Sequence, residues 1–354
     1  MNRTRIAISP IGRRFAVVAP FADRIPRARV AIVAKFFVAM ASLLAARSDV
    51  TAAPLFVSDE NSSTLEKISS TGTVSTFAGG IFSGGGPYDL AIDRNGNLLV
   101  ANGNIGSTFG TIYRYTPAGS RSIFFSANGA SFIPVSLAFD ANGRLFVGDT
   151  LDNNIRIVTT GGALLPFASG LVPERLAFDT NGNLFVADIS GVIYKFTSSG
   201  SRSVFATGSD NRAGLAFDSH GNLFASDYGG GAIDEYTPSG VQTRFAIGVS
   251  FPDGLAFDSS GTLFEADAGS GHIYKFSPTG VRSTFVSGLQ GPTFLAFAVP
   301  EPSALLMLAI GGLALIGAAV RSSRRRIGTS VATLGMTPDT NGAASPAIGA
   351  PTLP

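Results

Sequence analysis

Hydrophobic residues in the middle of this chain form short runs that recur in a fixed order. A segment of the type LAFD, a short polar turn and a segment of the type LFVAD occur together five times, with starts 47, 39, 39 and 40 residues apart. The copies are LAIDRNGNLLVAN at 90–102, LAFDANGRLFVGD at 137–149, LAFDTNGNLFVAD at 176–188, LAFDSHGNLFASD at 215–227 and LAFDSSGTLFEAD at 255–267. Runs rich in Val, Leu and Phe between Gly, Asn and Asp are typical of strands joined by tight turns. Each copy therefore predicts a pair of β-strands.

Two further apolar segments of strand length follow each copy, one resembling IYKF and the other STFASG. The first kind lies at 112–115, 155–158, 192–196, 233–236 and 273–276, and the second at 122–129, 165–170, 203–208, 243–248 and 283–288. No long stretch of residues 54–298 has the 3.6-residue periodicity of a helix. The pattern therefore predicts an all-β fold with four strands in each repeat of about 40 residues.

The second strand of each repeat is apolar on both faces. At 184–188, Leu184 and Val186 point to one side, while Phe185 and Ala187 point to the other. A strand of this kind is covered on both sides, so each sheet should lie between two similar sheets. This arrangement is a β-propeller, in which most of the 28 phenylalanines of the chain would fill the space between blades.

Two incomplete copies at the ends of the repeat region determine the number of blades. LFVSD at 55–59 is a second strand with no LAFD before it, and LAF at 295–297 is a first strand with no LFVAD after it. If these two strands pair, they complete a sixth blade and remove the exposed edges of the sheet stack. We therefore predict a six-bladed β-propeller over 54–298, closed by pairing of its N- and C-terminal strands.

The turn between the first two strands of a repeat has the form Asp-x-Asn-Gly-Asn at 93–97 and 179–183. The Asp side chain can accept hydrogen bonds from the turn, and Asn-Gly tolerates the positive φ angles of a tight hairpin. A calcium loop is the alternative interpretation, but the spacing is too short and no bidentate Glu follows. His220 and Ser260 replace the Asn in two copies, which suits a turn better than a metal site.

The phrases LAFDTNGNLFVAD and GVIYKFTSSG resemble NHL-type propeller repeats. The wider relatives that the resemblance suggests are the gluconolactonase and senescence-marker family and the lyase that opens virginiamycin B. The likeness covers nearly all of 54–298 and implies the fold. It implies no activity, because the matching residues are those that build strands and turns.

Charge is distributed unevenly along the chain. Residues 1–53 hold 9 Lys and Arg against 2 acids, residues 54–298 hold 13 against 20, and residues 299–354 hold 4 against 2. The repeat region is therefore acidic, with a net charge of −7. Nucleic-acid binding requires a basic surface on the folded domain, so nucleic acid is not an expected partner. The chain has no cysteine, which excludes disulfides and thiolate chemistry.

Residues 1–53 have the order of a signal peptide or leader. Seven arginines in 1–29 precede the apolar run VAIVAKFFVAMASLLAA at 30–46 and the small-residue stretch SDVTAAP. This order is typical of secretory signal peptides. A twin-arginine signal at Arg13-Arg14 and a buried or membrane helix are the alternatives.

The segment VPEPSALLMLAIGGLALIGAAVRSSRRR at 299–326 is similar to PEP-CTERM sorting signals of Gram-negative bacteria. Residues 304–320 are uncharged and just long enough for a transmembrane helix. The positive-inside rule then keeps the arginines in the cytoplasm and the propeller outside. The resemblance implies processing by an exosortase at the motif formed by Pro300, Glu301, Pro302, Arg324, Arg325 and Arg326. A tail at 327–354, rich in Ala, Gly, Thr and Pro, is predicted to be disordered.

Candidate catalytic residues are scarce. The two histidines, His220 in a turn and His272 at the start of a strand, are far apart in sequence and are expected to be surface residues. The Asp that ends LFVAD recurs in every copy but one, where Asn102 replaces it, which favours a shared hydrogen-bonding role. Glu265 replaces an apolar residue, and we expect it to face the channel or to pair with an arginine.

The most variable positions follow a proline that recurs just before each first strand. In gluconolactonase-like propellers, carboxylates at the central channel bind a divalent metal. Asp89, Glu174 and Asp253 are the candidates that this resemblance implies here, although Arg175 beside Glu174 and an ordinary role as solvated loop ends speak against a metal.

Two functions remain open from the sequence. The first is an exported, non-enzymatic binding or scaffold propeller at the cell surface, with polysaccharide or protein as its ligand and no cofactor. The second is a secreted lactonase or lyase that uses a divalent metal such as calcium.

Overall fold

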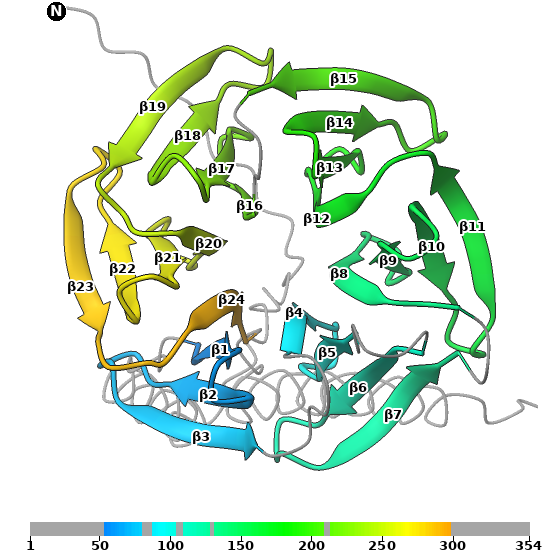
Figure 1. Ribbon diagram of the computed structural model, residues 1–354, viewed down its shortest axis with the longest axis horizontal. Helices are drawn as coiled ribbons and strands as arrows, with labels where there is room; N and C mark the ends of the chain where they lie inside the picture. Colours follow the sequence, from blue (N-terminus) through cyan, green and yellow to red (C-terminus); the bar gives the residue numbers. More distant parts are fainter. Residues whose placement is uncertain (1–52, 80–86, 104–108, 128–130, 209–212, 299–354) are drawn as a thin grey trace, which may run out of the picture. The chain divides into compact units, whose positions relative to one another are not determined.

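Six four-stranded antiparallel sheets are arranged as the blades of a β-propeller (Figure 1). The structure, a computed structural model, describes residues 53–79, 87–103, 109–127, 131–208 and 213–298. The predictions for the leader at 1–53, except for residue 53, for the motif at 299–326 with its helix at 304–320, and for the tail at 327–354 lie outside these residues. Among the residues that the structure covers, no helix is long and apolar enough to cross a membrane.

Each blade runs outward from the centre of the ring in four strands. The first strands are β4 (Pro87–Ile92), β8 (Pro134–Phe139), β12 (Pro173–Phe178), β16 (Leu215–Phe217), β20 (Pro252–Phe257) and β24 (Pro292–Phe297). The second strands are β1 (Leu55–Asp59), β5 (Leu98–Asn102), β9 (Leu145–Asp149), β13 (Leu184–Asp188), β17 (Leu223–Asp227) and β21 (Leu263–Asp267).

The third and fourth strands form the rim of the ring. The third strands are β2 (Thr64–Ile68), β6 (Thr111–Tyr115), β10 (Asn154–Val158), β14 (Val192–Phe196), β18 (Ala232–Tyr236) and β22 (His272–Phe276). The fourth strands are β3 (Val74–Gly79), β7 (Arg121–Ser126), β11 (Leu164–Ser169), β15 (Arg202–Thr207), β19 (Gln242–Ile247) and β23 (Arg282–Val286). Blade 1 is β4–β7, blade 2 β8–β11, blade 3 β12–β15, blade 4 β16–β19, blade 5 β20–β23, and blade 6 combines β24 with β1–β3.

Blade 6 closes the ring as the sequence predicted. Leu55 pairs with Phe297 and Val57 with Leu295 in an antiparallel register. The backbone N–H of Ala298 also donates a hydrogen bond of 3.0 Å to the carbonyl oxygen of Pro54. The two ends of the repeat region thus share one sheet, which leaves no unpaired first or second strand in the ring.

The Asp-x-Asn-Gly hairpins have the predicted capping role. In the first of them, Asp93 Oδ1 accepts hydrogen bonds of 2.8 Å from the backbone N–H groups of Asn95 and Asn97, and Asn97 Nδ2 donates to Asp93 Oδ2 at 2.8 Å. Gly96 alone takes a positive φ, of 77°, so the left-handed position requires the glycine and not the asparagine before it.

Phenylalanine packs the interfaces between blades. Phe185 of β13 meets Phe205 of β15 in its own blade and Phe217 of β16 in the next, with centroid distances of 4.9 and 5.0 Å in edge-to-face geometry. The same three positions repeat around Phe146, Phe224 and Phe264. The second strands are buried along their whole length, as their apolar faces predicted.

The inner strands begin earlier than the sequence pattern indicated. Where the proline is present in a first strand, it is the first residue of the strand and not a residue before it. Proline tolerates this place because its missing N–H is not needed there. The pairing register then shifts between the proline and the Leu of the LAFD segment, for example between Pro173 and Arg175. The variable residues therefore lie in a β-bulge.

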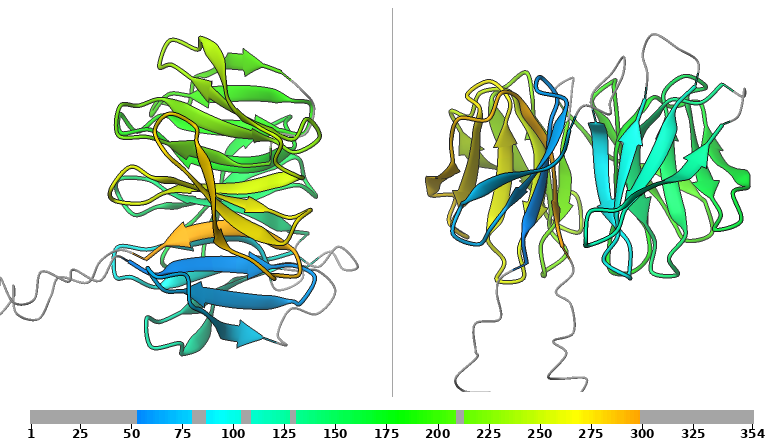
Figure 2. Two further views of the ribbon diagram at one scale, coloured as in Figure 1. Left: turned by 90° about the vertical axis from the view of Figure 1, so that its left-hand side faces the viewer. Right: turned by 90° about the horizontal axis from the view of Figure 1, so that it is seen from below.

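The two faces of the ring differ in what they carry. We call the face with the Asp-x-Asn-Gly hairpins the hairpin face, and the face with the connections between second and third strands and between blades the loop face. Leu55 begins a second strand and Phe297 ends a first strand, so both ends of the ring lie on the hairpin face, on the lower side of the right-hand view in Figure 2.

Candidate functional site

The bulges at the start of the inner strands carry polar side chains toward the centre of the ring at the loop face. Asp89 of β4, Arg175 of β12 and Asp253 of β20 are all at least nine-tenths buried. Their burial contradicts the alternative in which these positions are solvated loop ends. A bulge re-aims the side chains beside it, which explains how residues within a strand reach the channel.

Arg175 is the centre of this group. Its Nη1 lies 3.1 Å from Asp89 Oδ1, and its Nη2 lies 3.3 Å from Asp253 Oδ1. Its Nε donates a hydrogen bond of 2.6 Å to the carbonyl oxygen of Ala213. The guanidinium carbon is 3.9 Å from the ring centroid of Phe294, on β24 of the opposite blade. One side chain of blade 3 thus contacts blades 1, 4, 5 and 6 across the channel.

The two aspartates are held differently. Asp89 Oδ1 accepts from the backbone N–H of Leu90 at 2.8 Å, and Oδ2 accepts from Leu137 of blade 2 at 2.7 Å. Burial raises the pKa of Asp89, although Arg175 and these N–H groups oppose the rise. Burial raises the pKa of Asp253 to about 7, against the attraction of Arg175. Asp253 is therefore partly protonated near neutral pH.

The three carboxylates predicted as metal ligands, those of Asp89, Glu174 and Asp253, do not converge on one point between them. Asp89 and Asp253 converge on Arg175, and Glu174 is half-buried beside it with its Oε2 lacking a hydrogen-bond partner among the described residues. Burial raises the pKa of Glu174, and the carboxylate of Asp188 raises it further. Over the described ranges, no three His, Asp or Glu side chains are grouped closely enough to hold a metal ion. The divalent metal stays a prediction.

The aspartates that end the second strands have the shared hydrogen-bonding role predicted for them. Asp188 Oδ2 accepts from Val172 N–H in the connection between blades at 2.6 Å, and Oδ1 accepts from Ser190 N–H at 2.9 Å. The same two kinds of N–H bind Asp59, Asp149 and Asp267. These carboxylates hold the loops of the loop face in place.

The two histidines lie on opposite faces and form no catalytic group with each other. His220 is exposed in a hairpin-face turn, with Nδ1 at 3.4 Å from Asp218 Oδ2. His272 begins β22 at the loop face, where its ring stacks on Tyr274 at 5.4 Å.

Glu265 does not face the channel, which was one of its two expected placements; for the other, a neighbouring arginine, Arg282 is the arginine whose charge opposes the rise in the pKa of Glu265. Glu265 lies two residues after Leu263, so both side chains are on the same face of β21, and it pairs with Leu255 of β20. Both leucines pack in the cluster between blades 4 and 5. The side chain is fully buried, and neither carboxylate oxygen has a hydrogen-bond partner in the described part of the chain. Burial raises its pKa to about 9, and the nearby Asp267 adds to the rise.

Sequence reasoning missed four residues around the channel mouth. Phe294 stacks on Arg175. Burial raises the pKa of Asp253, Tyr88 and Tyr228, and the charge of Glu60 adds to each rise. Phe294 and Tyr88 occupy the variable positions after the recurring proline, so their variability was a usable signal. Glu60 and Tyr228 follow the Asp of a second strand, where no pattern marked them.

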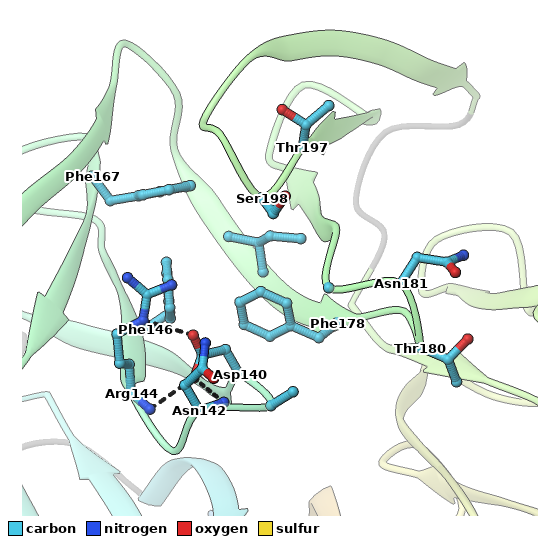
Figure 3. Close-up of a pocket in the computed structure, with 13 residues that line it drawn as sticks. Asp140, Asn142, Arg144, Phe146, Phe167, Phe178, Thr180, Asn181, Thr197 and Ser198 are labelled. Carbon is cyan, nitrogen blue, oxygen red and sulfur yellow. Dashed lines mark hydrogen bonds and ion pairs between the residues drawn. The ribbon is translucent and has the colours of Figure 1, made fainter. Parts of the chain in front are cut away.

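A pocket of about 270 Å³ lies between blades 2 and 3 on the hairpin face (Figure 3). Its apolar lining includes Phe146, Phe167 and Phe178, which form the repeated aromatic contact between blades. The charge of Arg144 at its rim is paired with Asp140 at 2.7 Å. The pocket is smaller than typical small-molecule sites of about 300–1,000 Å³, and its lining belongs to blade packing.

Comparison with known proteins gives one matching sequence motif and several similar solved structures. Residues 298–326 match the PEP-CTERM protein-sorting motif. No curated protein sequence matches the chain.

Several solved propellers are similar in structure. A chain in the crystal structure of a nidogen/laminin complex aligns with a TM-score of 0.61 and 18% identity, over 70% of this chain and 99% of that one. Virginiamycin B lyase from Staphylococcus aureus aligns with a TM-score of 0.51 and 17% identity, over 63% and 77%. A gluconolactonase candidate aligns with a TM-score of 0.52 and 17% identity, over 60% and 81%. At these identities the likeness shows the fold alone.

The structural and sequence findings agree on the two parts that the sequence pattern predicted. The ring of six blades accounts for the repeats, and the matched motif accounts for the Pro-Glu-Pro, apolar and arginine-rich segment. The chain is therefore a six-bladed β-propeller protein that carries a PEP-CTERM protein-sorting motif at residues 298–326, and this motif indicates export.

Proposed function

We propose that this chain is an exported, non-enzymatic propeller that binds a polysaccharide or protein at or outside the cell surface through its loop face. The observation that supports this proposal most directly is the position of Arg175 between Asp89 and Asp253. The carboxylates that a metal-dependent propeller enzyme would need are engaged with a guanidinium, which repels a metal cation. Their present role is to brace the blades across the channel.

The sorting motif supplies the route to the surface in this proposal. Residues 304–320 would span the membrane of a Gram-negative cell, with Arg324, Arg325 and Arg326 in the cytoplasm. An exosortase-type enzyme would then process the chain at Pro300-Glu301-Pro302. Because both ends of the ring lie on the hairpin face, processing there would leave the loop face unaltered.

Export is tested by changing Pro300, Glu301 and Pro302 together to alanine in the full chain. We expect the variant to accumulate in the membrane fraction as a longer precursor, while the unaltered chain is shortened and leaves that fraction. Equal processing of the two chains would show that the motif is not used.

The second candidate is a secreted metal-dependent lactonase or lyase. The closeness of Asp89, Glu174 and Asp253 to the channel favours it, as does the fold shared with virginiamycin B lyase and the gluconolactonase candidate. Metal analysis of the purified full chain separates the two functions. We expect no bound metal after exhaustive dialysis, whereas stoichiometric calcium or zinc would overturn the non-enzymatic proposal.

A further inference from the structure

We propose that the rim of the ring binds an acidic polysaccharide through exposed arginines of the fourth strands in blades 1, 3 and 5. This inference rests on the proposed binding function. It names the chemical class of the polysaccharide and adds the rim as a contact surface beside the loop face.

Charge is segregated within the propeller. The third and fourth strands hold nine of the 13 Lys and Arg of residues 54–298, but only three of the 20 Asp and Glu. The nine cations of the rim are Lys67, Arg114, Arg121, Arg156, Lys195, Arg202, Arg244, Lys275 and Arg282. The net charge of −7 therefore arises on the two faces and in the channel, while the rim itself is basic.

The acids of the rim leave most of this positive charge unpaired. Glu66 is buried and accepts hydrogen bonds from two threonine hydroxyl groups at 2.8 and 3.1 Å. Asp234 is buried and pairs with Arg244 Nε at 2.9 Å, and Arg156 pairs at 3.3 Å with an aspartate that ends a second strand. The other seven rim cations form no ion pair within the described part of the chain.

The arginines of blades 1, 3 and 5 share one arrangement. Each is exposed, and its guanidinium carbon lies over the ring of a third-strand tyrosine, 5.1, 5.2 and 4.6 Å from the centroid for Arg121, Arg202 and Arg282. Arg202 Nη1 also donates to Ser169 O at 3.4 Å, and Arg282 Nη1 donates to Gly248 O, in each case in the preceding blade. A guanidinium that is already positioned loses less freedom when its planar fork binds a carboxylate.

Exposed apolar side chains lie beside two of these arginines. Ile123 and Val204 are 64% and 59% exposed. Each lies two residues after the arginine, on the same face of its strand, and pairs with the tyrosine under that arginine. The rim thus presents positive charge next to apolar surface, which matches the carboxylates and the C–H surfaces of acidic sugars.

The same arrangement favours a polysaccharide over other polyanions. Nucleic-acid bases stack on open aromatic faces, whereas the guanidinium groups cover the tyrosine faces here. The cluster recurs in alternate blades, with β7, β15 and β23 on the outer edge of the ring (Figure 1). A polymer with a repeating charge can contact more than one cluster, and linked contacts strengthen one another.

The test measures binding of polygalacturonate, a chain of uronic acids, to the full chain in detergent. Dextran serves as the uncharged competitor, and a DNA oligonucleotide and polyglutamate serve as competing polyanions. One variant changes Arg121, Arg202 and Arg282 together to glutamine, and a second changes all three to lysine, which keeps the charge. Arg94→Gln, at an exposed hairpin position, is the matched control for Arg202→Gln alone.

We expect polygalacturonate to bind the native chain, and to bind it more weakly as the salt concentration rises. Arg202→Gln should weaken binding about twofold and the triple glutamine variant about tenfold, because each exposed charge contact contributes modestly. The triple lysine variant should keep most of the affinity, and Arg94→Gln should bind like the native chain.

The proposal is overturned if the native chain does not bind polygalacturonate or if the triple glutamine variant binds it unchanged. It is also overturned if dextran competes equally well, or if DNA or polyglutamate binds more tightly through the same arginines. None of these results alters the outcome of the metal analysis or the processing assay, which test the proposed function separately.

Discussion

Arg175 shows how a single residue can join distant parts of a ring. Its side chain forms ion pairs with two buried aspartates, binds a backbone carbonyl and stacks on a phenylalanine of the opposite blade. Arginine suits this place because its planar fork can bind several oxygens while its face packs on an aromatic ring.

Replacement of Arg175 by methionine should therefore destabilise the propeller strongly. The two buried carboxylates lose their counter-charge, and breaking a buried ion pair in this way costs about 3–5 kcal/mol. Denaturant unfolding of the full chain measures the loss. Arg94→Met, at an exposed hairpin position, serves as the control and should change the free energy of unfolding little. A small cost for both variants would show that Arg175 does not brace the ring.

Glu265 is a fully buried acidic residue in apolar surroundings. The corresponding residue is Val in blades 1, 2, 3 and 6 and Ala in blade 4, in agreement with the apolar packing between blades. A buried carboxyl without a partner remains protonated, and burial raises the pKa of Glu265 to about 9.

The raised pKa of Glu265 predicts a loss of stability in alkali. The folded chain keeps the proton up to about pH 9, while the unfolded chain releases it above the ordinary pKa of a glutamate. The stabilising contribution is thus complete below that ordinary value and is lost as the pH rises toward 9. The free energy of unfolding should fall by up to about 1.4 kcal/mol per pH unit between these limits.

Glu265→Gln should remove most of this slope. Denaturant unfolding at pH 6, 7.5 and 9 compares the two chains, and Glu235→Gln in the neighbouring blade should keep the slope of the native chain. If Glu265→Gln retains the native slope, the titrating group lies elsewhere.

At the scale of strands, the rim of the ring alternates between two kinds of blade. In blades 1, 3 and 5 an arginine of the fourth strand stacks on a tyrosine of the third, in the pairs Arg121–Tyr113, Arg202–Tyr194 and Arg282–Tyr274. In blades 2, 4 and 6 the tyrosine position holds Arg156, Asp234 or Glu66. The second strands alternate too, with Ala101, Ala187 and Ala266 in the first group and Gly148, Ser226 and Ser58 in the second. The repeat is thus two blades long in these details.

The closing strand β24 is an integral strand of the ring. Leu295 is buried, pairs with Val57, and packs in the cluster that joins blades 5 and 6. It occupies the same place in its blade as Leu176 in blade 3.

Leu295→Ala should accordingly cost as much as Leu176→Ala, about 2–5 kcal/mol for a buried leucine. Thermal or denaturant unfolding of the two variants of the full chain provides the comparison. A cost for Leu295→Ala well below that for Leu176→Ala would mean that β24 is only loosely attached, and that the ring does not depend on its closure.

At the scale of the whole molecule, acidic residues of different blades meet around Arg175 at the channel mouth. Burial raises the pKa of Asp253 to about 7 against the attraction of Arg175, and the charges of Glu60, Asp89 and Glu174 add to the rise. The negative charge at the mouth therefore grows as the pH rises through neutrality.

The architecture could be predicted from the sequence because the strands and turns of each repeat follow from residues close together in the chain. The alternation in Leu184–Asp188 predicted strands covered on both faces, and the complementary fragments at Leu55–Asp59 and 295–297 predicted ring closure. The turn chemistry of Asp93 and the shared role of Asp188 were confirmed for the same reason, since each acts on nearby backbone groups.

The candidate site could be predicted only in part from the sequence. Asp89 and Asp253 were singled out by their variability, but their contact with Arg175 depends on bulges that bring three blades together. Glu265 was expected at the channel or beside an arginine. The pleat of β21 turned it away from the channel toward blade 4, and Arg282 is the arginine whose charge acts on it.

Periodicity in the chain alone established the strands, their number in each blade and the closure of the ring, because these follow from short-range patterns of burial and hydrogen bonding. The tertiary structure alone decided which side chains meet at the centre. The channel is formed by one bulge from each of several blades, about 40 or more residues apart in sequence, and no local pattern encodes which of them carry opposite charges or an aromatic ring. The same separation explains why no local pattern predicted the ring contact between Tyr228 and Phe251, which come from two different blades.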